Sequence, residues 1–178
     1  MTCKRLFKAI MIILMIQVLC LSGTAYAANN LLMNNDFHAA DEDGLPSDWY
    51  TDAYILEPGY TIFSLREGDS EHPFSAEIHN IGDNDARFAQ VVEVEPESLY
   101  LFSGYILADH VEGGQGANLS IEGVYAFSEK CYDTNGKWQY IEYYGETGPE
   151  QHYLTVFARL GGYSGESKGV ASFADLSL

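Results

Sequence analysis

Two arginines, Arg87 and Arg159, stand out in a chain that has 26 Asp and Glu against nine Lys and Arg. Each lies in a stretch where apolar and polar residues alternate, on the side opposite the apolar set. There a guanidinium can donate paired hydrogen bonds to hydroxyl groups, or it can form an ion pair with Glu122 or another acid. The two interpretations are compatible, and both predict a polar face that contains the arginines.

The same alternation adds other side chains to this non-core face. Asn118 and Glu122 supply an amide and a carboxylate, and a tyrosine ring can stack on a sugar while its hydroxyl stays in water. By strand or loop position, four tyrosines are stacking candidates: Tyr54, Tyr105, Tyr125 and Tyr163. The predicted floor of the face consists of Arg87, Tyr105, Asn118, Glu122 and Arg159.

Catalytic chemistry has no comparable signal. A glycosidase needs two carboxylates at a set separation, one with a raised pKa, and 26 acidic residues satisfy any separation by chance. No histidine stands at a zinc-ligand spacing from another histidine or from a cysteine. We therefore expect a protein that is not an enzyme and has no cofactor, with a small glycosidase as a minor alternative.

The two tryptophans, Trp49 and Trp138, are expected in the core, because large aromatic side chains more often fill cores than ligand sites. Cys131 is the only cysteine beyond residue 27, so the remaining chain can form no internal disulfide. We expect Cys131 to be a partly buried apolar residue.

The first 27 residues have the pattern of a secretory signal peptide. A basic start is followed by an apolar run over residues 9–21 and by the small residues Ala25 and Ala27. The run is shorter than the roughly 20 residues of a membrane-spanning helix. We expect cleavage before Ala28, a secreted or surface-exposed protein, and one domain over residues 28–178.

Removal of residues 1–27 leaves six Lys and Arg against 26 Asp and Glu, a net charge near −20. A charge of this sign repels nucleic acid and anionic lipid and favours neutral ligands or cations. We expect a monomer with a neutral ligand and no nucleic-acid or lipid partner.

Short runs rich in Tyr, Phe and Val, separated by Gly, Pro and Asn turns, predict an all-β fold. About nine strands at near-regular spacing indicate an antiparallel sandwich. Alternation predicts core positions that include Phe88, Phe102, Leu119 and Val156. The expected strands cover residues 30–33, 60–66, 74–79, 87–94, 100–108, 118–125, 139–145, 153–160 and 170–178.

Several segments resemble the CenC-like carbohydrate-binding modules. The first has the sequence Asn-Leu-Leu-Met-Asn-Asn-Asp-Phe at residues 30–37, and Gly-Leu-Pro-Ser-Asp-Trp follows at 44–49. Further matches lie at 88–96, 100–105, 137–139 and 169–178. The resemblance implies the galactose-binding-like jelly roll and binding of a poly- or oligosaccharide, as an accessory to a glycoside hydrolase or a cell-surface protein.

Many such modules hold a structural calcium with acidic residues after the first Phe and in a pair on the last strand. Here His38 and Ala174 occupy those two positions, and neither supplies the hard oxygen ligand that calcium prefers. A site built from Asp36, Asp175 and backbone carbonyls is the alternative. We expect weak or absent stabilisation by calcium.

The leading interpretation is a non-catalytic module that binds a neutral poly- or oligosaccharide outside the cell. The alternatives are a structural or adhesion sandwich, or the N-terminal extracytoplasmic module of a larger membrane-bound carbohydrate-active enzyme.

Overall fold

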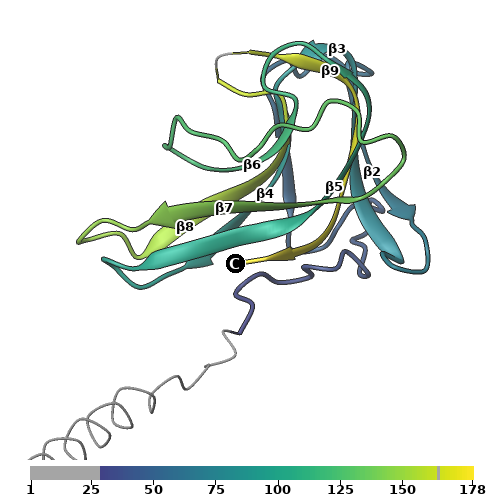
Figure 1. The fold of residues 1–178 in the computed structure, drawn as a ribbon. Coiled ribbons are helices and arrows are strands. Elements are labelled where there is room, and N and C mark those ends of the chain that lie inside the picture. Colours follow the sequence, from purple (N-terminus) through teal and green to yellow (C-terminus); the bar gives the residue numbers. More distant parts are fainter. Residues whose placement is uncertain (1–28, 164) are drawn as a thin grey trace, which may run out of the picture.

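The computed structural model describes residues 29–163 and 165–178, and these residues form nine strands and no helix (Figure 1). The strands are β1 (Tyr50–Ala53), β2 (Thr61–Glu67), β3 (Phe74–Asn84), β4 (Ala86–Glu93), β5 (Leu99–Glu112), β6 (Ala117–Ile121), β7 (Gln139–Glu146), β8 (Tyr153–Leu160) and β9 (Ser167–Ser177). The predicted signal peptide lies outside the described residues. Within them, no helix is long and apolar enough to cross a membrane.

Two antiparallel sheets pack face to face. The four-stranded sheet has the order β1-β4-β8-β6, and the five-stranded sheet has the order β2-β3-β9-β5-β7. The last strand, β9, lies between β3 and β5, so the end of the chain completes the centre of a sheet (Figure 1). The predicted all-β antiparallel sandwich is confirmed.

The core lies between the sheets and follows the period of two that the sequence showed. Phe88 of β4, Phe102 of β5 and Phe173 of β9 are fully buried there, with Leu119 and Val156. Burial of one such side chain stabilises the fold by about 1.5–3 kcal/mol. Because apolar residues fill most of the inward positions, the outward positions can carry other chemistry.

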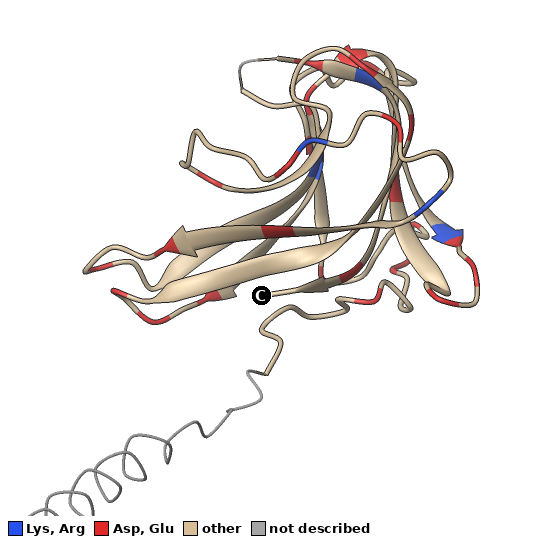
Figure 2. Cartoon of the chain, in the orientation of Figure 1, with Lys and Arg blue, Asp and Glu red and all other residues tan. Residues whose placement is uncertain are grey.

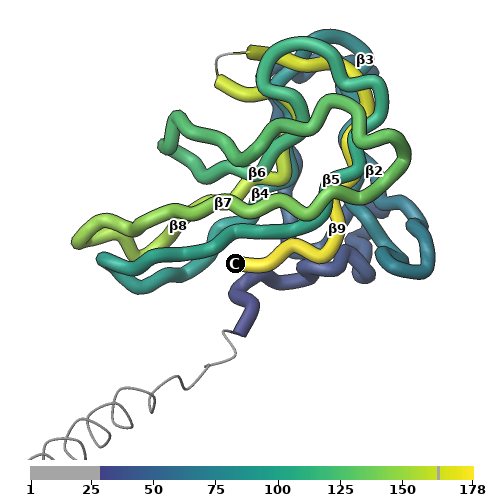
Figure 3. Tube along the Cα trace, viewed as in Figure 1, coloured from purple at the N-terminus to yellow at the C-terminus, as the bar shows by residue number. Residues whose placement is uncertain are grey.

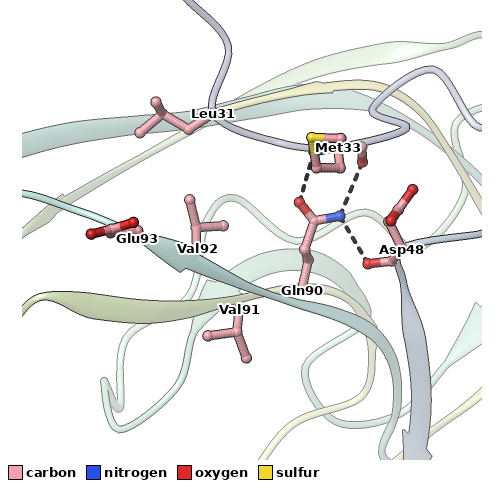
Figure 4. Close-up of a pocket in the computed structure, with 7 residues that line it drawn as sticks. All are labelled: Leu31, Met33, Asp48, Gln90, Val91, Val92 and Glu93. Carbon is pink, nitrogen blue, oxygen red and sulfur yellow. Dashed lines mark hydrogen bonds between the residues drawn. The ribbon is translucent and has the colours of Figure 1, made fainter.

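Residues 30–33 do not form the expected strand. The Met33 N–H donates to Gln90 Oε1 at 2.8 Å, and Gln90 Nε2 donates to the Met33 and Asp48 carbonyls at 3.0 Å each (Figure 4). A buried glutamine on β4 therefore takes the place of a partner strand. Gln90 also lines an open hollow of about 670 Å³. Its amide is already engaged there in hydrogen bonds that hold the chain in place.

The segment before β1 also contains Trp49, which is buried as predicted and packs on Phe37 with ring centroids 5.4 Å apart. Strand β1 itself follows directly and was not among the expected strands. Figure 2 shows Asp and Glu distributed over strands and loops, whereas Lys and Arg are few.

Candidate functional site

The outer face of the four-stranded sheet carries side chains in rows that cross the strands. Register makes Asp52 of β1, Arg87 of β4, Arg159 of β8 and Asn118 of β6 direct neighbours. Their neighbours along each strand point into the core, since successive side chains face opposite sides of a sheet. The first row therefore puts both arginines side by side, between a carboxylate and an amide.

Two further rows complete this surface, which we call the polar face. The second row is Tyr50, Ala89, Phe157 and Ser120, and the third row is Val91, Thr155 and Glu122. Thr155 Oγ1 donates to Glu122 Oε2 at 2.8 Å, which holds that carboxylate at the sheet. Burial, with the charges of Glu122 and Asp52, raises the pKa of Tyr50, so its hydroxyl stays protonated and can donate.

Both arginines are held by aspartates. Arg159 Nε donates to Asp85 Oδ1 at 2.6 Å and its Nη2 donates to Asp85 Oδ2, although the arginine has no exposed surface. Arg87 donates from Nε to Asp52 at 2.9 Å and from Nη1 to Asp85 at 3.3 Å. Burial alone would lower the pKa of Arg87, but the bond to Asp52 and the charge of Asp85 raise it. The arginine charges are thus balanced within the face.

Asp85 is the single residue between β3 and β4, where the chain crosses from one sheet to the other. The Asp85 N–H donates to Asn84 Oδ1 at 2.9 Å, and Asn84 Nδ2 donates to the Ile55 carbonyl at 3.0 Å. Asn80, also buried, donates to the Asn84 carbonyl at 3.2 Å. This asparagine network fixes the carboxylate that both arginines share.

The chain between β6 and β7, residues 122–138, folds back along the free edge of β6 (Figure 3). The Ser128 N–H donates to the Leu119 carbonyl at 3.0 Å, and Ala117 and Cys131 exchange backbone hydrogen bonds of 2.8 and 2.9 Å. We call it the return segment. It covers β6, so Asn118 has no exposed surface although it points away from the core.

The return segment and the turn after β8 bring aromatic rings over Arg159. Its guanidinium carbon lies 4.1 Å from the centroid of Tyr163 and 5.6 Å from those of Phe127 and Phe157. The ring centroid of Tyr125 lies 5.5 Å from that of Tyr163, and Tyr125 is 84% exposed. Arg159 therefore sits beneath an aromatic cover whose outer tyrosine faces solvent.

Gly161 makes this turn possible. Its φ is 101°, and a Cβ there would lie 2.4 Å from the Asn84 carbonyl oxygen. Asn118 Nδ2 donates to the Gly161 carbonyl at 2.9 Å, which ties the turn to β6. A glycine is required by both the backbone angle and the close approach.

Three side-chain atoms of the described residues are buried without a hydrogen-bond partner, and all three lie on the polar face. They are Asn118 Oδ1, Ser120 Oγ and Arg159 Nη1. An unpaired buried polar group costs about 1–3 kcal/mol, and such groups are uncommon in folded proteins. An amide oxygen, a hydroxyl that can donate or accept, and a charged N–H donor thus remain unsatisfied on the polar face.

Six of the eight predicted site residues meet on this face. They are Arg87, Asn118, Glu122, Tyr125, Arg159 and Tyr163. The arginines do form ion pairs, as one of the two interpretations predicts, and the acids that they pair with are Asp52 and Asp85. Tyr54 lies just beyond β1 with its side chain largely exposed, and its backbone N–H donates to the Asp85 carbonyl at 2.9 Å.

Tyr105 does not belong to the polar face, and the prediction that it shares a face with Arg87 is wrong. It lies on β5 in the five-stranded sheet, where it pairs with Tyr140 of β7. Trp138 is not in the core either: it is partly exposed, and its indole Nε1 donates to Asp69 at 3.1 Å. Both aromatics lie on the opposite side of the sandwich.

Several members of the polar face are not among the predicted site residues. Asp52 and Asp85 hold the arginines, Tyr50 flanks them, and Phe127 and Ser120 complete the site. For Ser120 the alternation does predict the correct face, because it lies two residues from both Asn118 and Glu122, but it does not by itself indicate a binding role. The aspartates have no such signal, because acidic residues are too abundant to single out.

The two acids considered for calcium have histidine partners. Asp36 Oδ1 lies 2.6 Å from His38 Nδ1, and this hydrogen bond lowers the pKa of Asp36. Asp175 Oδ2 lies 2.6 Å from His72 Nδ1. Among the described residues, no group of three His, Cys, Asp or Glu side chains is arranged to hold a metal ion.

Comparison with solved structures identifies the architecture. A carbohydrate-binding module described as TmCBM61 in complex with β-1,4-galactotriose superposes with a TM-score of 0.55 at 14% identity, over 84% of this chain and 97% of the module. A structure described as a CBM4 module gives a TM-score of 0.53 at 16% identity, over 82% of this chain and 96% of the other. The protein has the fold of carbohydrate-binding modules.

The same fold occurs within a larger protein. The enzymatically active domain of tailspike protein 4 from Bacteriophage CBA120 gives a TM-score of 0.57 at 10% identity, over 83% of this chain. This chain spans only 21% of the length of that tailspike structure. No protein-family model and no curated protein matches the chain by sequence.

Proposed function

We propose that the protein binds a neutral poly- or oligosaccharide on its polar face and does not cleave it. The observation that carries the proposal is the set of unpaired atoms on this face, Asn118 Oδ1, Ser120 Oγ and Arg159 Nη1. Sugar hydroxyls both donate and accept hydrogen bonds, so they can satisfy an amide oxygen, a serine hydroxyl and a guanidinium N–H on one surface. The CenC-like resemblance of the sequence supports the same ligand class.

The charge balance favours a neutral ligand over an acidic one. Asp85 and Asp52 already pair with the two arginines, and Glu122 adds a further negative charge to the face. A uronate or phosphate would meet these carboxylates and a strongly acidic chain. Hydroxyl groups carry no such penalty, and they can bond to the carboxylate oxygens that the arginines leave free.

Access to the unpaired atoms requires the aromatic cover to shift. Tyr163 is half-exposed and lies directly over the Arg159 guanidinium, and Tyr125 extends beyond it into solvent. In the proposed complex the Tyr163 side chain turns outward, a sugar ring stacks between the two tyrosines, and its hydroxyls reach the sheet. The energy of satisfying buried polar groups offsets the loss of the Tyr163 contact.

We place this activity outside the cell, because the first 27 residues have the pattern of a signal peptide. A second candidate follows from the tailspike likeness, in which this fold is part of a larger chain. In that case the module is the N-terminal extracytoplasmic part of a larger carbohydrate-active enzyme, and its glycan binding serves that enzyme.

The test is a screen of the protein against immobilised neutral and acidic glycans, followed by titration of the best ligand. Tyr125→Ala and Tyr163→Ala should each weaken binding about tenfold, which corresponds to about 1.4 kcal/mol. Ser120→Ala should weaken binding without lowering the free energy of unfolding, because it removes an unpaired buried hydroxyl.

Tyr144→Ala is the matched control, since this exposed tyrosine lies on β7 of the other sheet. It should bind like the wild type. The proposal would be contradicted if the protein retained no glycan, or if the Tyr125, Tyr163 and Ser120 variants bound as tightly as the wild type. A preference for acidic glycans would contradict the assignment of a neutral ligand.

A further inference from the structure

The outer face of the five-stranded sheet carries a second set of aromatic side chains, on the opposite side of the sandwich from the polar face. The His72 ring lies 4.3 Å from that of Tyr105 and 4.9 Å from that of Trp138, centroid to centroid. Tyr105 in turn lies 5.2 Å from Tyr140. We call these four side chains the aromatic row.

Trp138 is held firmly although it is partly exposed. Its indole Nε1 donates to Asp69 Oδ2 at 3.1 Å, while Asp69 Oδ1 accepts the backbone N–H groups of Glu71 and His72 at 2.8 and 2.9 Å. These backbone hydrogen bonds hold the pKa of Asp69 below its ordinary value. His72 is fixed from its other side by Asp175. The indole is therefore ordered before any ligand arrives, which reduces the entropy lost on binding.

The indole lines a hollow of about 210 Å³. Leu107, Ser172 and Glu77 form one row across β5, β9 and β3. Arg66 of β2 stands at the next strand and pairs with Ser75 in register. The hollow thus combines an aromatic wall, a small floor of hydroxyl and apolar groups, and a polar rim.

The polar rim has hydrogen-bonding capacity to spare. Arg66 Nε lies 3.6 Å from Glu77 Oε2, and Ser172 Oγ donates to the same oxygen at 3.4 Å. The Arg66 side chain is largely exposed and has five N–H donors, of which this ion pair uses one. With Glu67 and Asp69 the lining is net acidic, so it disfavours an anionic ligand and accepts hydroxyl donors.

We propose that this hollow is a second glycan-binding site, in which a neutral pyranose ring lies against Trp138 and bonds to Arg66 and Glu77. An ordered indole beside a guanidinium and a carboxylate provides the apolar surface and the paired polar groups that a sugar ring needs. The site is independent of the polar face. Because the two faces lie on opposite sides of the sandwich, one molecule then contacts two glycan chains.

Tryptophan emission gives this site its own signal. The chain has two tryptophans, and Trp49 is only 6% exposed and packs on Phe37. A ligand that stacks on the second indole should change the emission, whereas one confined to the polar face should leave it unchanged. The probes are β-1,4-galactotriose, cellohexaose and xylohexaose, titrated to roughly 10 mM so that weak binding is detected.

The variants separate the two sites. Trp138→Ala removes the wall, and Arg66→Ala removes a rim donor that is too exposed to affect folding. The double variant Tyr125→Ala/Tyr163→Ala disables the polar face, and Tyr144→Ala is the control. We expect at least one probe to alter the emission of the wild type, the control and the double variant alike. Arg66→Ala should lower the affinity for that probe at least fivefold. Calorimetry should find one binding site fewer per chain in Trp138→Ala than in the wild type.

Each remaining outcome decides one of the two proposals. If the emission responds to no probe, or if Trp138→Ala and Arg66→Ala bind every probe as the wild type does, the second site does not exist. Binding that survives in these two variants and is lost in the double variant leaves only the polar face. Binding that survives in the double variant and is lost in Trp138→Ala leaves only the second site.

Discussion

The Arg159 guanidinium and the Asp85 carboxylate form a two-pronged ion pair in which the arginine has no exposed surface. Removal of one partner from such a pair leaves a buried charge without compensation and typically costs about 3–5 kcal/mol. Asp85 also bonds to Arg87, so its loss affects both guanidinium groups. The pair is thus a structural support for the polar face as well as part of it.

Asp85→Asn should therefore lower the free energy of unfolding by about 3 kcal/mol, measured by urea denaturation. Asp52→Asn is the matched control, since Asp52 is nearly half-exposed and its pair with Arg87 is screened by water. That change should cost about 1 kcal/mol or less. Equal losses in the two variants would show that burial does not govern the strength of these pairs.

Gly161→Ala should destabilise the protein by about 2–4 kcal/mol and reduce glycan binding. The new Cβ would meet the Asn84 carbonyl at 2.4 Å in a backbone conformation that disfavours alanine. Gly123→Ala is the control, because Gly123 also has a positive φ, of 75°, but a Cβ there would have no atom within 4 Å. It should cost about 1 kcal/mol. A Gly161→Ala variant as stable as Gly123→Ala would contradict the close approach.

Alternation along the sequence was enough to define the sandwich and most of the polar face. The positions of Phe88, Phe102 and Val156 followed from a period of two, and so did the outward direction of Arg87 and Arg159. These predictions succeeded because successive side chains of a strand point to opposite faces of the sheet. Core positions therefore alternate along the sequence with positions on the outer face.

The same pattern could not say which sheet a strand joins. Tyr105 does point away from the core, but β5 pairs with β7 and β9, so its outer face is on the far side. Strand β1 is only four residues long and its Thr-Asp centre gives no apolar signal, so Asp52 was missed with it. The family resemblance and the size of the side chain both predict a core position for Trp138, but it lies just before β7 and its indole donates to Asp69, which keeps it at the surface.

Calcium should not stabilise the protein. Asp36 and Asp175 each have a histidine within 2.6 Å, and a cation would have to displace these contacts with fewer oxygen ligands than it prefers. The melting temperature should be the same within 1 °C, on the order of experimental scatter, in millimolar CaCl₂ and in excess chelator. A rise of several degrees that the chelator reverses would demonstrate a site.

Cys131 should be unreactive in the folded protein at neutral pH. Its thiol is buried, donates to Gln139 Oε1 at 3.5 Å, and has a pKa that desolvation raises from 9.0 to about 11. Because the thiolate is the nucleophile, alkylation by iodoacetamide at about pH 8 should be slow in buffer and fast in roughly 6 M guanidinium chloride, which unfolds the protein.

The same shift predicts a dependence of stability on pH. The folded state binds the thiol proton more tightly than the unfolded state, so this contribution is complete below pH 9 and is lost as pH rises toward 11. Two pKa units correspond to roughly 2–3 kcal/mol as an upper bound. Urea denaturation of wild type and Cys131→Ala between about pH 8 and 11, the range set by this shift, tests it. The wild type should lose more stability than the variant over this range, and parallel curves would mean that the thiol does not titrate differently in the two states.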